Sequence, residues 1–343
     1  MVSVIGEAPA LAGADRRLLA TADRLLTDAV AEGLVRFDAA GQIEGGLAER
    51  WTVTDDGTSY IFRLREARWT NGEPVRAQQV VSLLKRQLAR GARNSLAPYL
   101  SAIDDVVEMT PEVIEIELAR PRPDLLKLFA QPELALVRAS AGGGAGPFRV
   151  ANSGTHAVLL RPIEDPDPDA DAPTPEDNVR LIGERAARAI VRFVNRQADL
   201  VAGGTLADWP LVQRADPTAA TIRVDPAAGL FGLAVTRRDG LLADPQTRAA
   251  LAAAFDRAAL VAAVSPDWTG AETLLPDQLD SLSPPTQPAW ASEPREQRLA
   301  AIRARVATWR ATAGTPTLGL ALPAGTGGTL LWTRLAADLY AMG

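Results

Sequence analysis

The sequence predicts an α/β fold with more than one core unit, and three observations support this. The chain has 343 residues, and roughly 100 to 200 residues per domain gives two or three units. Residues 178–204 read as strand, helix and strand, an order typical of a parallel sheet. Hydrophobic residues make up 47% and charged residues 23%, near globular averages, so neither wholesale disorder nor a membrane-embedded body is indicated.

The N-terminal segment predicts a strand, a loop and a helix. Residues 2–5 form a short β-like run, and a proline-containing loop follows it. Between residues 15 and 34, apolar side chains recur at helical spacing: Leu18, Leu19, Ala22, Leu25, Leu26, Ala29 and Val30. A tight hairpin across residues 38–41 then leads to Trp51.

Residues 46–88 predict a hairpin and then an amphipathic helix. Tyr60, Phe62 and Leu64 alternate with their neighbours, and D-D-G at 55–57 supplies the turn. After a turn at Asn71-Gly72, a helical face is formed by Val80, Val81, Leu84 and Leu88. Strands at 103–109 and 113–118 continue this β-rich region.

The middle of the chain predicts a return to α/β structure. Residues 124–130 are helix-like, and 142–146 hold four glycines, which indicates a flexible connector or a loop that approaches another segment closely. Strands are expected from Phe148 and at 156–162. The acidic, proline-rich residues 164–178 predict a solvated loop.

The C-terminal third predicts strands and helices in alternation. Residues 229–239 read as an apolar strand, followed by a helix with Asp244 at the N-cap and Pro245 at its first position. A proline-rich loop, a helix over 294–313, a strand at 317–322 and a final helix complete the chain.

Sequence motifs for catalysis and cofactor binding are missing. The chain has no cysteine, which excludes disulfides, thiolate metal sites and cysteine nucleophiles. It lacks the phosphate-binding G-x-x-x-x-G-K-[ST], the zinc motif H-E-x-x-H and the nucleophile motif G-x-S-x-G. His156, the one histidine, lies in an alternating strand and is interpreted as a surface or packed side chain. We expect no catalytic residue, metal or cofactor.

Carboxylates and tryptophans are the remaining candidates for a site. The pairs Asp55-Asp56 and Asp104-Asp105 are interpreted as turn or edge residues, and the acidic loop lacks the spacing of a calcium site. Trp51 and Trp69 are expected in the core. The tryptophans near loops are candidates for a ligand surface: Trp209, Trp268 and Trp290.

The net charge and the hydropathy of the chain limit which binding partners and which cellular location we expect. The net charge of −6, without a basic stripe, makes nucleic acid an unlikely partner. The first residues lack a signal peptide, and no apolar run of 18 residues occurs, so we expect either a cytoplasmic protein or the prior removal of a targeting segment.

Residues 32–88 resemble the family 5 extracellular solute-binding proteins, the peptide, dipeptide and nickel binders of ABC importers. The ordered elements of the resemblance are E-G-L, a hairpin, G-L-A-E-x-W, D-D-G, F-x-L-R, W-x-x-G-x-P and an A-x-x-V helix. Later blocks are similar in the same order, at 116–137, 144–150, 196–204 and 230–261. The likeness thus covers most of the chain, which is shorter than family members usually are.

The resemblance implies a periplasmic-binding-protein-like type II fold, with two lobes and an extra β-rich domain on lobe I. The implied segments are 1–50 and 144–229 for lobe I, 51–143 for the β-rich domain, and 230–343 for an incomplete lobe II. The resemblance also implies a periplasmic or extracellular, membrane-associated location. It implies a monomer whose partner is an ABC permease in the membrane.

The resemblance places the ligand-binding residues in two short segments. The first follows the first strand and comprises Glu7, Ala8, Pro9, Ala10 and Leu11, and the second enters lobe II and comprises Val235, Thr236 and Arg237. The first continues as Leu11-Ala12-Gly13 where the family has an L-D-P-like signature, and Val235 replaces a family-typical Asn. An Arg237 guanidinium can pair with a ligand carboxylate, although an ordinary exposed loop arginine remains the alternative.

The expected function is capture of a peptide-like or other small solute by hinge closure, and its delivery to a permease. Two alternatives stay open. One is a degenerate binding-protein-like module used for sensing or interaction, and the other is a hydrolase, which one histidine and no nucleophile motif support weakly. Nickel is disfavoured because few imidazole or thiolate ligands are available.

Overall fold

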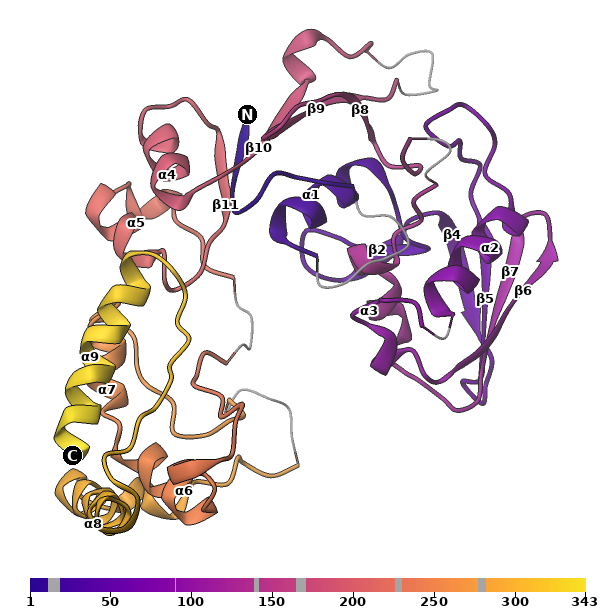
Figure 1. The fold of residues 1–343 in the computed structure, drawn as a ribbon. Helices are drawn as coiled ribbons and strands as arrows, with labels where there is room; N and C mark the ends of the chain where they lie inside the picture. The colour runs from indigo at the N-terminus through magenta and orange to yellow at the C-terminus, as the bar shows by residue number, and fades with distance from the viewer. Residues whose placement is uncertain (12–18, 90, 139–141, 165–170, 226–229, 277–281) are drawn as a thin grey trace. The chain divides into compact units, whose positions relative to one another are not determined.

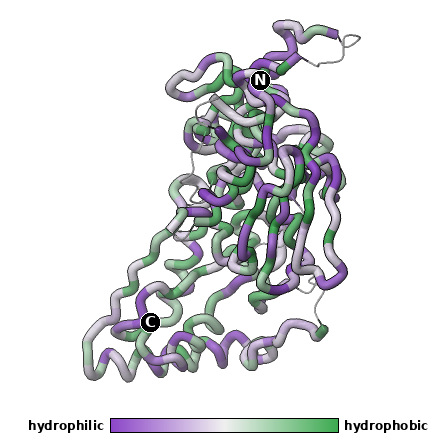
Figure 2. Tube along the Cα trace, turned by 90° about the vertical axis from the view of Figure 1, so that its right-hand side faces the viewer, coloured by the Kyte–Doolittle hydropathy of each residue, from purple (hydrophilic) through white to green (hydrophobic). Residues whose placement is uncertain are grey.

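The computed structural model describes residues 1–11, 19–89, 91–138, 142–164, 171–225, 230–276 and 282–343. Two compact units are present, residues 1–203 and 204–343 (Figure 1). No helix in these ranges is long and apolar enough to cross a membrane, and hydrophilic residues interrupt the hydrophobic ones along the trace (Figure 2). The predicted boundaries at residues 50, 143 and 229 stay predictions.

A five-stranded mixed sheet is the first sheet of unit 1. Its strand order is β11-β1-β10-β9-β8. The parallel strands are β1 (Val2–Ile5), β10 (Val179–Glu184) and β11 (Leu200–Gly203), and α4 (Ala186–Val194) connects the last two. The antiparallel strands are β9 (Ala157–Pro162) and β8 (Phe148–Ser153). The predicted strand–helix–strand order is therefore confirmed.

Helix α1 (Thr21–Val30) packs on this sheet but is shorter than the helical spacing predicts. Its Leu26 and Val30 are buried in a cluster with Val4, Val158, Leu160 and Leu181. Residues 15–18 of the predicted helix lie outside the described residues.

The second sheet of unit 1 is antiparallel, with the order β4-β5-β7-β6. Its strands are β4 (Ala48–Val53), β5 (Ser59–Leu64), β7 (Val113–Leu118) and β6 (Ile103–Thr110), and α2 (Ala77–Leu88) contacts β6 and β7. Tyr60, Phe62 and Leu64 are only 3%, 0% and 5% exposed, which confirms the predicted apolar face. A small hairpin, β2 (Val35–Phe37) and β3 (Ile43–Gly45), and the short α3 (Leu125–Phe129) accompany this sheet.

The glycine-rich segment is a close-approach loop. The N–H groups of Gly144 and Gly146 donate to the Val30 carbonyl oxygen, at 2.9 and 3.2 Å. A Cβ on Gly146 would lie 2.5 Å from the Ala31 nitrogen, so glycine is required for this approach. Of the two alternatives for this segment, the structure therefore supports the second.

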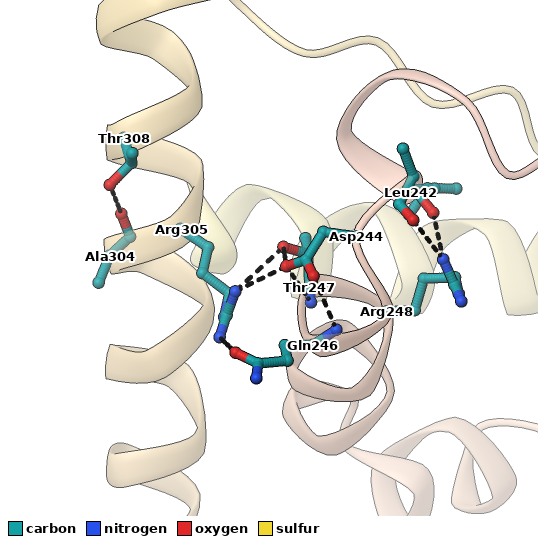
Figure 3. Close-up of polar contacts among 9 residues, drawn as sticks. Leu242, Asp244, Gln246, Thr247, Arg248, Ala304, Arg305 and Thr308 are labelled. Carbon is teal, nitrogen blue, oxygen red and sulfur yellow. Dashed lines mark hydrogen bonds and ion pairs between the residues drawn. The ribbon is translucent and has the colours of Figure 1, made fainter.

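Unit 2 is built from helices in its described residues: α5 (Trp209–Ala215), α6 (Pro245–Ala254), α7 (Arg257–Ala262), α8 (Arg295–Ala313) and α9 (Thr326–Met342). Helix α6 begins as predicted, since the Asp244 carboxylate accepts hydrogen bonds from the Gln246 and Thr247 N–H groups (Figure 3). Short 3₁₀ turns in the two units span Ala97–Tyr99, Pro132–Leu134, Pro175–Asp177, Ala219–Thr221, Gly240–Leu242 and Ala289–Ser292.

Two predicted strands are wrong as secondary structure. Among the described residues, 230–239 and 316–323 are in no strand, although both have the expected apolar pattern. The physical reason is that a strand exists only where a neighbouring segment forms hydrogen bonds with it. Neither segment has such a neighbour within the described ranges. Phe231, Leu233 and Val235 are accordingly exposed.

Candidate functional site

The carboxyl ends of the three parallel strands of unit 1 form the first candidate site. Ile5 is in register with Glu184 on one side and with Gly203 on the other, so the strands end together. In open α/β sheets, ligands bind in the crevice outside such carboxyl ends. The loop that leaves β1 here is residues 6–11, which contains the first predicted group of ligand-binding residues.

Two hydrogen bonds donated by backbone N–H groups of this loop hold it in place. The Gly6 N–H donates to the Glu184 carbonyl oxygen at 3.0 Å, and the Ala10 N–H donates to Asp23 Oδ1 of α1 at 2.8 Å. Of the five predicted residues, Glu7 and Ala10 are exposed, Ala8 and Leu11 are half-buried, and Pro9 is buried. Leu11 packs against the core beside α1. Ala12 and Gly13 of the predicted signature lie outside the described residues.

Gly183 of β10 allows the loop to take this path. A Cβ at this position would lie 1.9 Å from the Glu7 carbonyl oxygen and 2.7 Å from the Ala8 Cα. Any other residue would therefore push the loop away from the strand ends. Sequence reasoning missed this glycine, because its contact joins residues that are far apart in the chain.

A buried ionic network lies beneath the same edge. The Glu184 side chain is 6% exposed, and its carboxylate accepts hydrogen bonds from Ser3 Oγ at 2.7 Å and from Arg192 Nε at 2.9 Å. Arg188 Nε lies 3.2 Å from the same carboxylate. This network ties β1, β10 and α4 together, and Glu184 also accepts the Gly6 N–H of the loop through its carbonyl oxygen. The sequence signal was available, because Glu184, Arg188 and Arg192 follow one another at helical spacing of four.

The second predicted group lies in unit 2. Val235, Thr236 and Arg237 are exposed in the segment without a strand partner. Arg237 Nη2 lies 2.8 Å from Asp239 Oδ2, and the arginine side chain is 83% exposed. In this structure the Arg237 guanidinium thus pairs with a carboxylate of its own chain.

The candidate tryptophans make contacts within unit 2. The rings of Trp209 and Trp268 lie 5.3 Å apart between centroids. Trp290 has the guanidinium groups of Arg257 and Arg298 at 4.8 and 5.8 Å from its ring centroid. The structure therefore brings Trp209 and Trp268 together, and these contacts are ordinary packing and cation–π interactions.

The two tryptophans expected in the core belong to unit 1. Trp69 is 1% exposed, and Trp51 is half-buried and packs against the same hydrophobic core. Both agree with the prediction from the sequence.

The carboxylate pairs named in the sequence analysis have local structural partners. Asp56 accepts hydrogen bonds from Thr54 and Thr58, which lower its pKa to about 2 and confirm the turn interpretation. Asp105 forms an ion pair with Lys85 at 2.7 Å. Within the described ranges, no three histidine, aspartate or glutamate side chains are grouped so that they could hold a metal ion.

A cavity of about 350 Å³ in unit 1 is lined by the polar residues Arg24, Asp28, Glu32, Arg36 and Gln131. Burial raises the pKa of Asp28 to about 6, against the opposing effect of the Arg24 guanidinium. Arg24 itself forms an ion pair with the buried Glu133. This cavity was not predicted from the sequence.

Comparison with known proteins identifies a family model and relatives that are similar to this chain in sequence. Residues 42–301 match the model of the bacterial extracellular solute-binding proteins, family 5 Middle. The probable deoxycholate-binding periplasmic protein of Escherichia coli is 30% identical in an alignment 132 residues long, which covers 33% of this chain and 24% of that protein. The periplasmic oligopeptide-binding protein of Haemophilus influenzae is 36% identical over 85 residues, 24% of this chain and 15% of that protein. These matches thus span a quarter or less of the relatives' lengths.

Solved structures share the fold over the whole chain. The murein tripeptide-binding protein of Escherichia coli superposes with a TM-score of 0.80 at 18% identity, covering 100% of this chain and 72% of that one. The predicted fold class is confirmed as a mixed α/β fold of the kind that this binding protein has.

Proposed function

Because the chain belongs to the bacterial extracellular solute-binding proteins of family 5, we propose that it is the substrate-binding component of an ABC importer. In this proposal it captures a peptide-like or other small solute by hinge closure and delivers the solute to a membrane permease. The match of the family model to residues 42–301 is the observation that carries the proposal. The family is one of solute-binding proteins, not of enzymes.

The loop at the strand ends supports a role in ligand contact. Glu7 is exposed in the loop that leaves the carboxyl end of β1, the end at which open α/β sheets bind ligands. Its carboxylate can pair with a ligand ammonium group. Gly183 and the Glu184 network fix the backbone below it. We therefore propose Glu7 to Leu11 as ligand-binding residues of unit 1. For unit 2 we propose Val235 to Arg237.

Peptides are the first solutes to test, because relatives are named for oligopeptide and murein tripeptide binding. The titration would use di-, tri- and oligopeptides and deoxycholate, followed by tryptophan fluorescence and by thermal shift. We expect saturable binding of at least one peptide, and about tenfold weaker binding in Glu7→Ala, the loss of one charge-assisted contact. The control is Glu112→Ala, an exposed carboxylate of the other sheet. No saturation with any of these solutes would contradict the proposal.

The names of the relatives also support a proposal for the location. We propose a periplasmic or extracellular protein, since the two curated relatives above are named as periplasmic. That it acts as a monomer is a further part of this proposal and rests on the resemblance to the family. Fractionation of cells that express the gene with its own upstream sequence tests this location. Recovery only in the cytoplasm would argue against the importer role.

A second candidate function is an interaction or sensing module that binds no solute. The observation that favours it is the exposed position of Val235 to Arg237, in a segment with no strand partner in the described residues. This candidate predicts that unit 1 is fully folded by circular dichroism while no solute of the panel binds.

A further inference from the structure

The cavity of unit 1 is large enough for a small molecule. Its volume of about 350 Å³ lies at the lower end of the range for ligand pockets, roughly 300 to 1,000 Å³. Its wall is formed by the end of α1, by β2, and by residues 130–135, which follow α3. Helix α3 contacts β2, and α1 contacts the turn Pro132–Leu134, so these elements surround one space within unit 1 (Figure 1).

Three of the four charged side chains that line this cavity have ion-pair partners. These pairs are Arg24 with Glu133, Arg36 with Glu44, and Glu32 with Arg65. Within each pair the two charges neutralise one another, so these three lining residues create no need for a further counter-ion.

Asp28 is the fourth charged residue of the lining, and its carboxylate has no such partner. In the part of the chain that the structure describes, it forms no hydrogen bond and no ion pair. Arg24, one turn earlier on α1, acts on Asp28 only through its charge and is itself paired with Glu133. Asp28 is therefore a charged group of the wall that is free to bind a ligand.

The neighbouring Glu133 makes this region more negative. It is 2% exposed, and its Oε2 atom is buried without a hydrogen-bond partner among the described residues. Leaving a buried acceptor unpaired is costly, and such groups are uncommon in folded proteins. The carboxylates of Asp28 and Glu133 thus stand against the single guanidinium of Arg24, which leaves an excess of one negative charge.

The composition of the wall indicates which kind of cation fits. In the described ranges, no three histidine, aspartate or glutamate side chains are grouped to hold a metal ion, whereas one free carboxylate suffices for an ammonium group. The remainder of the lining is largely apolar: Ala31, Val35, Phe37, Ala130, Pro132, Ala135 and Pro147. A charge of +1 with a short hydrocarbon body therefore matches both parts of the wall.

We propose that this cavity binds a small primary amine, with the ammonium group on the Asp28 carboxylate and the hydrocarbon body against Phe37. The ammonium N–H groups donate to the Asp28 carboxylate oxygens. Phe37 is 38% exposed, so the hydrocarbon covers apolar surface that otherwise meets water. The site goes beyond the proposed transport function and does not rest on it, because its lining residues include none of Glu7 to Leu11 and none of Val235 to Arg237.

A titration with n-butylammonium chloride tests the proposal. The chain of residues 1–343 at pH 7.5 is titrated and followed by saturation-transfer difference NMR. For a ligand this small we expect saturable binding with a Kd on the order of 1 mM. The matched probes 1-butanol and butyrate have the same hydrocarbon body without the positive charge, and we expect both to bind at least about tenfold more weakly.

Two matched variants locate the binding. Asp28→Asn removes the charge and keeps the size of the side chain, so n-butylammonium should bind about tenfold or more weakly. Asp104→Asn makes the same change at an exposed carboxylate of β6 and should alter the Kd by less than about twofold. Circular dichroism of both variants shows that the fold is retained.

The pH dependence gives a second measurement. The charged groups around the Asp28 carboxylate are Arg24, Glu32, Arg36 and Glu133, and burial raises the pKa of Asp28 to about 6. At pH 5 about one in ten of these carboxylates is ionised, while the amine stays protonated, so binding should be about tenfold weaker than at pH 7.5. In Asp28→Asn this pH dependence should be lost.

Four results would overturn the proposal. These are no saturation up to about 100 mM n-butylammonium, equal binding of 1-butanol or butyrate, an unchanged Kd in Asp28→Asn, and loss of amine binding in Glu7→Ala with Asp28→Asn unaffected. The last result would place the amine at the loop after β1. Failure of the peptide titration leaves this test intact, because n-butylammonium and Asp28→Asn report on the cavity alone.

Discussion

Residues 59–64 and 230–235 have the same alternation of apolar side chains, yet one segment is a central strand and the other lies alone. β5 is hydrogen-bonded to β4 on one side and to β7 on the other, and its Phe62 is 0% exposed. Phe231 belongs to the corresponding apolar alternation of its own segment and is 55% exposed. The alternation therefore specifies which face of a segment is to be covered, but not that the covering strand is present.

The helices of unit 2 form as expected, and they show why only strands need a partner that is distant in the chain. A helix satisfies its N–H and C=O groups within its own segment, so it forms when its sequence and caps suit it. α6 and α8 pack together around Ala254, Leu299, Ile302 and Val306 without help from a sheet. A strand depends on hydrogen bonds to residues that are distant in the chain. Unit 1 supplies such partners to β5, whereas the described residues of unit 2 supply none to residues 230–235.

The largest expected effect comes from the same substitution in the two segments. Phe62→Ala removes a fully buried ring that contacts Phe129 edge-on, and should destabilise unit 1 by about 3–5 kcal/mol. Phe231→Ala removes an exposed ring and should change the free energy of unfolding by less than about 0.5 kcal/mol. Urea unfolding followed by circular dichroism measures both. Equal losses would mean that residues 230–235 are covered in solution.

One ion pair from each unit allows the same comparison of a buried and an exposed segment for polar contacts. Glu184→Gln removes a buried charge that Ser3 and Arg192 contact, and leaves arginine donors with a weaker partner, so we expect a loss of about 2–3 kcal/mol. Asp239→Asn removes the exposed partner of Arg237, and we expect less than about 0.5 kcal/mol. Similar losses in the same urea experiment would show that residues 237–239 are buried in solution.

How far the sequence predicts this protein depends on how local each feature is. Turns, alternation and caps predicted β5, α2 and the start of α6, because each of these signals lies within one segment. The close approach of Gly183 to Glu7, by contrast, joins residues from different parts of the chain, and no local pattern contains it.

The candidate site divides in the same way. Glu7 is exposed, while Pro9 is buried and Leu11 packs against the core, and the role of all three in ligand binding stays a prediction. Which residues of a loop face outward depends on the tertiary contacts of that loop. The local sequence of the loop does not show these contacts.

A smaller effect is expected at the helix start that the sequence predicted. The Asp244 carboxylate accepts hydrogen bonds from the N–H groups of Gln246 and Thr247 and contacts Arg305 Nη1 at 2.8 Å (Figure 3). Asp244→Ala should cost about 1 kcal/mol, the usual loss for an N-cap. The control Asp239→Ala also removes a carboxylate near α6 but no cap. A thermal midpoint unchanged by Asp244→Ala would mean that α6 is held by its packing on α8 alone.

The smallest expected effect compares two carboxylates of unit 1 by the pH dependence of stability. Burial raises the pKa of Asp28 from 3.8 to about 6, so the folded chain binds this proton more tightly than the unfolded chain. Stability from this group is therefore highest below pH 4 and falls as the pH rises through about 6. Asp28→Asn should raise the thermal midpoint by roughly 1–2 °C at pH 7.5, and this gain should vanish near pH 4.

Asp56 should respond with the opposite sign. Hydrogen bonds from Thr54 and Thr58 lower its pKa from 3.8 to about 2, so the ionised form stabilises the turn above pH 4, and this stabilisation is lost as the pH falls through about 2. Asp56→Asn should therefore lower the midpoint at pH 7.5, where Asp28→Asn raises it. Thermal midpoints of both variants between pH 3 and 7.5 measure the contrast, and shifts of the same sign at pH 7.5 would show that burial of Asp28 does not control its ionisation.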